Sequence, residues 1–134
     1  MCLKYRGNWL NNDLDNIKPD ANIKIKLLWS NSAETTAIST KNVTLSESIN
    51  NYTLYFVVFK AETGYGNYDT TGPMPVESQM LLQAHSNKNK YRTCSVSGTT
   101  FKIANGYKCS SYNNTATDNA VCIPVKLYGI KILS

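Results

Sequence analysis

The chain has 134 residues, of which 42% are hydrophobic and 17% charged, and its formal net charge is +5. This length suits one domain, because a chain of this size buries roughly two thirds of its surface on folding. The positive charge comes from single lysines and not from a basic run, so we expect no nucleic-acid binding. No apolar run approaches the ~18 residues of a membrane span, and the first residues lack the apolar segment of a signal peptide, so we expect no membrane insertion.

Residues 1–21 differ from the rest and are predicted to form an N-terminal arm, or the remnant of a shaft, before a domain at 22–134. Leu10, Leu14 and Ile17 follow one another at intervals of four and three, which is a helical or heptad-like spacing. Two helical turns are marginal alone in water, so several copies packed side by side would explain the pattern. An irregular arm packed on its own domain is the alternative.

From residue 22 onward the hydrophobic pattern has a period of two, which is typical of β-strands. In residues 22–29 one set of apolar side chains alternates with lysines, and Leu28 interrupts the lysine set; the apolar set is Ile23, Ile25, Leu27 and Trp29. Further strand-like segments follow at residues 42–49, 51–62, 90–98, 99–106, 107–114 and 119–133.

Three details refine this fold prediction. Residues 51–62 are dense in apolar and aromatic side chains, which predicts a strand buried on both faces. Residues 76–84 fit either a strand or a short helix. Asn105-Gly106 is a hairpin-turn signal, because both central residues of a type I′ turn take positive φ, and Ser97-Gly98 is a weaker one. Short strands at this spacing predict an all-β fold, an antiparallel β-sandwich or jelly roll, with helix confined to the arm or to residues 76–84.

The four cysteines are Cys2, Cys94, Cys109 and Cys122. They are widely spaced, and a chain of this size does not need disulfides, so buried free thiols are favoured over disulfides. Cys94 and Cys109 are the pair best placed to meet if any do. Because His85 is the single histidine and no two ligands are closely spaced, we expect no metal site and no cofactor.

Residues 27–62, LLWSNSAETTAISTKNVTLSESINNYTLYFVVFKAE, resemble a segment near the C-termini of bacteriophage tail and tail-fibre proteins. In that group a strand ending in Leu-Trp-Ser precedes a loop of small residues, a Thr-Leu-Ser-x-Ser-Ile-x-x-Tyr element and an apolar strand. Here these are Leu28 to Ser30, Thr44 to Tyr52 and Leu54 to Phe59. The final strand, Tyr128 to Ile132, is similar too. The likeness covers about 23–62 and 120–134; residues 63–119 match nothing in the group.

This resemblance implies a receptor-binding tip, or knob, at the distal end of a phage tail fibre. Such a domain would be a homotrimer joined to the rest of the fibre, located in the virion and working outside the cell. Residues 1–21 would then be the end of a coiled-coil shaft. Its partner would be a bacterial surface saccharide.

The sequence has few residues in arrangements suited to catalysis, and we predict that the protein is not an enzyme. The carboxylates are scattered, and Glu62 with Asp69 or Glu77 is the least unfavourable pair for glycoside hydrolysis. His85 precedes Ser86, but neighbours on a strand point to opposite faces, which prevents a base–nucleophile contact.

Binding is better supplied by two long polar loops, residues 62–75 and 110–119. Tyrosine offers a flat apolar face and a hydroxyl, and Asn and Asp bond sugar hydroxyls, which together suit weak multivalent saccharide recognition. The candidate ligand-binding residues are Tyr65, Tyr68, Asp69, Tyr112, Asn113, Asn114 and Asp118. The alternatives are a structural tail, baseplate or secreted β domain, or a polysaccharide-degrading enzyme fragment.

Overall fold

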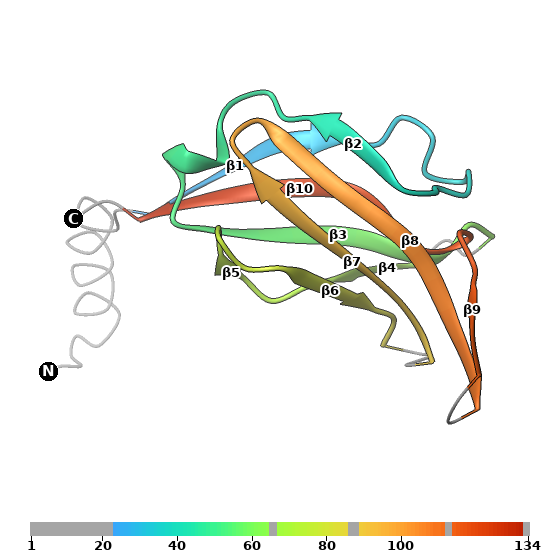
Figure 1. The fold of residues 1–134 in the computed structure, drawn as a ribbon. Helices are drawn as coiled ribbons and strands as arrows, with labels where there is room; N and C mark the ends of the chain where they lie inside the picture. The colour runs from blue at the N-terminus through green and yellow to red at the C-terminus, as the bar shows by residue number, and fades with distance from the viewer. Residues whose placement is uncertain (1–22, 65–66, 86–88, 112–113, 133–134) are drawn as a thin grey trace, which may run out of the picture.

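The computed structural model describes residues 23–64, 67–85, 89–111 and 114–132, and these form two antiparallel β-sheets packed face to face (Figure 1). The prediction of an all-β antiparallel fold is confirmed. The arm at 1–21, with Leu10, Leu14 and Ile17, lies outside the described residues. None of the helices in the described part is long and apolar enough to cross a membrane.

The first sheet, sheet A, has the order β1-β10-β3-β4, and a short β5 also pairs with β3. Its strands are β1 (Ile23–Ser30), β10 (Val121–Ile132), β3 (Leu54–Glu62), β4 (Tyr68–Thr70) and β5 (Met74–Pro75). The strand that ends the described chain, β10, therefore lies in the middle of a sheet, hydrogen-bonded to β1 on one side and β3 on the other.

The second sheet, sheet B, has the order β2-β8-β7-β6, and β9 pairs with β8. Its strands are β2 (Lys41–Thr44), β8 (Thr100–Ser111), β7 (Lys90–Ser97), β6 (Met80–Gln83) and β9 (Asn114–Thr117). A 3₁₀ turn, η1 (Ile49–Asn51), lies between β2 and β3, at the junction of the segments 42–49 and 51–62 that were predicted as separate strands. Of the two possibilities for residues 76–84, the strand is the one observed.

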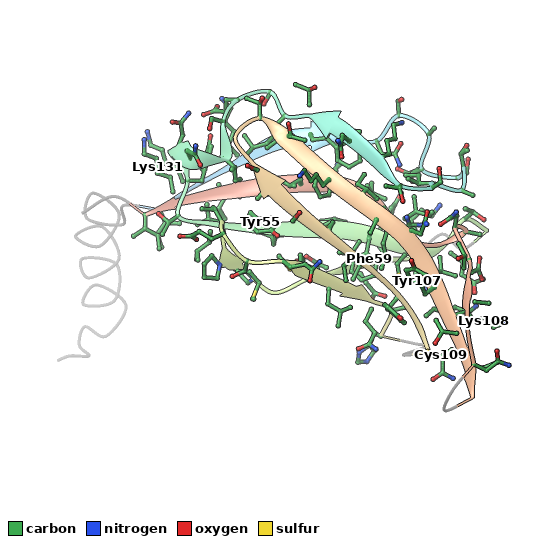
Figure 2. The ribbon with its side chains drawn as sticks, viewed as in Figure 1. Tyr55, Phe59, Tyr107, Lys108, Cys109 and Lys131 are labelled. Atoms are coloured by element: carbon green, nitrogen blue, oxygen red, sulfur yellow. The ribbon has the colours of Figure 1, made fainter. Side chains whose placement is uncertain are left out.

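The core lies between the two sheets. Tyr55, Val57 and Phe59 alternate along β3 and are at most 2% exposed, while Phe101 and Ile103 of β8 face them from sheet B. Figure 2 shows Tyr55 and Phe59 between the sheets, with Tyr107, Lys108 and Cys109 toward one end of the sandwich and Lys131 at the other. The Tyr55 hydroxyl donates a hydrogen bond to the Ser78 carbonyl at 2.7 Å, so this buried polar group has a partner.

Ile23, Ile25, Leu27 and Trp29 were predicted to share one face of a strand. This is wrong, because β1 contains a bulge. The register shifts between Leu27 and Trp29, so Leu28 is the extra residue. Leu28 and Trp29 both pack in the core, whereas Ile23 and Ile25, before the bulge, are about 60% exposed. A bulge shifts the phase of the alternation, so one apolar set is divided between the two faces of the sheet.

The predicted hairpin at Asn105-Gly106 is also wrong, because β8 continues through both residues. The turn between β7 and β8 is at Gly98-Thr99, within one residue of the weaker signal at Ser97-Gly98; Ser97 pairs with Thr100, and Gly98 has a φ of 58°. Gly106 has another role. A Cβ there would lie 2.3 Å from the Asp118 carbonyl oxygen, so this position needs glycine for close approach and not for a turn.

Cys94, Cys109 and Cys122 are free thiols. Cys94 pairs with Ile103 in the core, whereas Cys109 lies further along β8 opposite Thr115, so these two do not meet. Burial raises the pKa of the Cys94 thiol to about 12 and that of Cys122 to about 11. Cys2 lies outside the described residues.

We expect native protein at about pH 8 to be alkylated at Cys109 at least about tenfold faster than at Cys94 or Cys122, because the two buried thiols lack both access and thiolate. Peptide mapping after a timed iodoacetamide pulse measures each site separately. Denatured protein, in which all sites should react alike, is the control. Equal native rates at the three sites would contradict the buried positions.

Candidate functional site

The two ends of the sandwich differ. The start of β1 and the end of β10 lie at one end, and the end of β3, the start of β7 and the β8–β9 pair lie at the other (Figure 1). At this second end the Thr63 N–H donates to the Ala120 carbonyl at 3.0 Å, and Lys90 forms an ion pair with Glu62. The bases of the two predicted binding loops are therefore side by side.

A surface hollow of about 360 Å³ lies here between the edge strands β4 and β6. We call it the β4–β6 hollow; its lining residues are Tyr68, Asp69, Thr70, Gln83, Ala84 and His85. Two of the predicted ligand-binding residues, Tyr68 and Asp69, thus share one concave surface, formed where the two sheets meet at their edges.

Tyr68 presents a fixed aromatic ring at this hollow. Its side chain is 53% exposed, yet its hydroxyl donates a hydrogen bond to Glu34. The Lys60 ammonium lies 5.8 Å from the ring centroid and 3.8 Å from the Glu34 carboxylate. The hydrogen bond to Glu34 raises the pKa of the Tyr68 phenol, so the hydroxyl stays protonated. A half-exposed ring with Lys60 over one face and Glu34 at its hydroxyl is preorganised to contact a ligand.

Asp69 joins the two sheets at the same place. One oxygen of its carboxylate accepts from the His85 backbone N–H at 3.2 Å, which connects β4 of sheet A to the residues just after β6 of sheet B. Because a carboxylate has two acceptor oxygens and about four lone-pair sites, this single bond leaves acceptor capacity toward the hollow.

The two predicted loops are partly strand, because residues 62–75 include β4 and β5 and residues 110–119 include the end of β8 and all of β9. The second of these segments contributes less to the hollow. Asn114 is exposed on β9, and its carbonyl accepts from the Ser110 hydroxyl at 3.4 Å. Asp118 stabilises the turn into β10, since its carboxylate accepts from the Ala120 N–H at 3.2 Å and its own N–H donates to Gly106. Tyr65, Tyr112 and Asn113 lie outside the described residues.

Arg92 holds this end of the sandwich together from inside. Its side chain is 0% exposed, and its guanidinium donates six hydrogen bonds of 2.6–3.3 Å to five backbone carbonyls. These carbonyls come from both sheets and two connecting segments: Ile38, Ala104, Asn119, Val121 and Cys122. Burial lowers the pKa of Arg92 to about 10, so the group stays charged at neutral pH. The turn that carries Asp118 thus has a rigid base.

The carboxylates considered for hydrolysis have separate surroundings. Glu62 pairs with Lys90 at one end of β3, while Glu77 follows β5, which pairs with Leu54 and Tyr55 at the other end. The seven residue steps from Tyr55 to Glu62 span about 23 Å of strand, well beyond the roughly 5–10 Å between the carboxyl groups of a glycosidase. Among the described residues there is no group of three or more His, Cys, Asp or Glu that could hold a metal ion.

A second hollow, of about 490 Å³, lies at the opposite end and is lined by Lys24, Ile25, Lys26, Glu47, Tyr52 and Lys131. Lys26 and Glu47 form an ion pair at 2.5 Å. Its three ammonium groups and one carboxylate give it net positive charge, but it contains none of the residues predicted to bind ligand.

Sequence reasoning missed the two residues that position Tyr68. Glu34 was counted only as one of several scattered carboxylates, because its contacts with residues 60 and 68 are long-range. Lys60 carried a usable signal: it is the single charge within the apolar stretch from Leu54 to Ala61, and a charge there is buried only if it is paired.

Comparison of the sequence with protein-family models finds no match, and a search of curated proteins finds no significant relative.

Proposed function

We propose that this chain is a non-enzymatic recognition domain, the homotrimeric receptor-binding tip of a phage tail fibre, which binds a bacterial surface saccharide. The observation that carries the proposal is the half-exposed ring of Tyr68, fixed by Glu34 and Lys60 at the rim of the β4–β6 hollow. The hollow is lined by β4, which pairs with the second half of β3, away from the end of the sandwich where β1 begins and β10 finishes (Figure 1). This position suits a domain that contacts its receptor end-on.

The chemistry of the β4–β6 hollow fits a sugar. The exposed phenol face can cover the C–H face of a pyranose ring, as aromatic side chains do with flat apolar surfaces. The carboxylate of Asp69 can accept from sugar hydroxyls at the same rim. The hollow is open and small, so one copy binds weakly, and several copies on one rigid body would provide the avidity that attachment needs.

The competing functions make different demands on the same residues. A structural tail, baseplate or secreted β domain would not depend on the Tyr68 ring. A polysaccharide-degrading fragment would need two cooperating carboxylates, and Glu62 and Glu77 are too far apart to cooperate. Polysaccharide cleavage that is lost when Asp69 alone is changed would nevertheless favour an enzyme.

We expect Tyr68→Ala to weaken binding to arrayed bacterial surface polysaccharides at least about tenfold, a loss of about 1.4 kcal/mol per site, because it removes the stacking face. Tyr68→Phe keeps the ring and should retain most of the binding. Light scattering and thermal melting should be unchanged in both variants.

Tyr107→Ala is the control that tests where the ligand binds. Tyr107 is also a tyrosine, but it stacks on Tyr91 in sheet B, with 5.6 Å between the ring centroids. Its binding should equal that of the wild type. Loss of binding in Tyr107→Ala but not in Tyr68→Ala would move the site to sheet B and overturn the assignment. No polysaccharide binding by the wild type would refute the proposed function.

A further inference from the structure

The first half of β1 has its apolar side chains on the outside of the sandwich. Ile23, Ile25 and Leu27 point away from sheet B and are 60%, 61% and 42% exposed. The lysines between them are exposed but lie on the face of β1 that is turned toward sheet B. Lys26 is opposite Gly129, and a Cβ added at Gly129 would meet Leu28 and Tyr52 on that face. A strand with this inverted amphipathicity is suited to a second apolar layer on its outer face.

The apolar surface continues across β10 and β3. Residues directly opposite one another share a face, and the register places Ile132 beside Ile23 and Tyr128 beside both Leu27 and Phe56. The rings of Phe56 and Tyr128 stack with centroids 5.0 Å apart, and Ile132 is 51% exposed. We call this surface the outer apolar face: Ile23, Ile25, Leu27, Phe56, Tyr128 and Ile132. None of these six side chains is charged, and the exposed Lys126, opposite Ser30 and Val58, borders them on the same face. Contiguous apolar patches mark interaction sites.

The same strand has an open edge. β1 is the edge of sheet A, with β10 as its one strand partner among the described residues. At its far end the Ser46 N–H donates to the Leu28 carbonyl, but none of the strands that the structure describes pairs with residues 23–27 on that side. A long, flat, apolar edge strand is a template for pairing with another chain unless it is covered. The open edge and the exposed apolar face therefore coincide on one short segment.

We propose that the outer apolar face is an interface between copies of this chain. The 22 residues before Ile23 include Leu10, Leu14 and Ile17 at heptad-like spacing. Copies associated through such a seam would begin their β1 strands next to one another, with the outer apolar faces toward a shared axis. The six apolar side chains also suit self-association of a chain whose net charge is +5, because like charges at the centre of the contact would repel. This inference rests on the self-association in the proposed function, but not on saccharide recognition.

The test is the mass of the full chain by light scattering at tens of micromolar, with Ile25→Glu as the variant. Ile25 is 61% exposed in the single chain, so the substitution leaves the domain folded while placing a charge in the interface. We expect the wild type to be a multiple of 14.9 kDa and Ile25→Glu to fall to 14.9 kDa with an unchanged circular-dichroism spectrum. Leu81→Glu is the matched control, because Leu81 is 51% exposed on β6 in sheet B, and it should keep the wild-type mass.

Several results would overturn the interface. A monomeric wild type whose melting temperature drops in Ile25→Glu would mean that the face is covered by residues 1–22 of the same chain. Loss of mass in Leu14→Asp but not in Ile25→Glu would confine association to the arm. An equal loss of mass in Leu81→Glu would show that dissociation is not specific to the outer apolar face. Saccharide binding by a monomer would leave the proposed site intact, so the two proposals fail separately.

Discussion

Replacing Arg92 with methionine is expected to lower the free energy of unfolding by about 3–5 kcal/mol. The guanidinium supplies the donors for five backbone carbonyls in a place with no access to solvent, and methionine supplies none. Replacing both members of a buried polar pair by apolar groups can be neutral, but here the carbonyl partners belong to the backbone and remain. The loss is a large share of the about 5–15 kcal/mol that stabilises a typical domain.

Urea unfolding followed by circular dichroism measures this effect as a shift in midpoint at constant slope. The unfolding midpoint of Arg92→Lys should lie between those of the wild type and Arg92→Met. An ammonium keeps the charge, but it has three donors in place of five and cannot reach the same carbonyls at once. Lys102→Met is the matched control, because Lys102 is exposed on β8, and its stability should stay within about 0.5 kcal/mol of the wild type. An Arg92→Met variant as stable as this control would show that the carbonyls find other donors.

Most strands could be predicted from the sequence because alternation needs only local information. Alternation located the segments of β7 and β10, and a dense apolar run located β3. The predicted burial of β3 on both faces is wrong for its first half, because Tyr55, Val57 and Phe59 are buried while Leu54, Phe56 and Val58 are only partly buried. The errors arose where the backbone departs from regular alternation. The bulge at Leu28 moved Ile23 and Ile25 to the outside, and a further shift occurs between Pro124 and Lys126. One inserted residue reverses every later position, and no periodicity analysis registers the insertion.

The candidate site was predictable only in part, for the same reason. Loop composition singled out Tyr68 and Asp69, and both line one hollow. Their binding of a ligand stays a prediction. It could not identify Glu34, which is 34 residues away from Tyr68 in the sequence and reaches it through the tertiary fold. Arg92 shares the alternation of Cys94 and Val96 in β7, so its burial was predictable, but its carbonyl partners were not.

Gly106→Ala is expected to lower the free energy of unfolding by about 2–3 kcal/mol. The added Cβ would lie 2.3 Å from the Asp118 carbonyl oxygen and 3.0 Å from the Arg92 Nη2 atom. Neither neighbour can move freely, because the Asp118 N–H donates to the Gly106 carbonyl at 2.8 Å and the Gly106 N–H donates to the Asn119 side chain at 2.9 Å. The strain comes from space and not from backbone conformation, since Gly98 is the one described glycine with positive φ.

Gly72→Ala is the control for this substitution, because nothing lies within 4 Å of its added Cβ, and its unfolding midpoint should match the wild type. The double variant Arg92→Met, Gly106→Ala adds a sharper test. Gly106 and Arg92 contact the same turn, Asp118 to Asn119. If one substitution already displaces this turn, the second should lower the free energy of unfolding by less than it does alone. We therefore expect the combined loss to be smaller than the sum of the single losses by about 1 kcal/mol. Strict additivity would mean that the two residues stabilise this end of the sandwich independently.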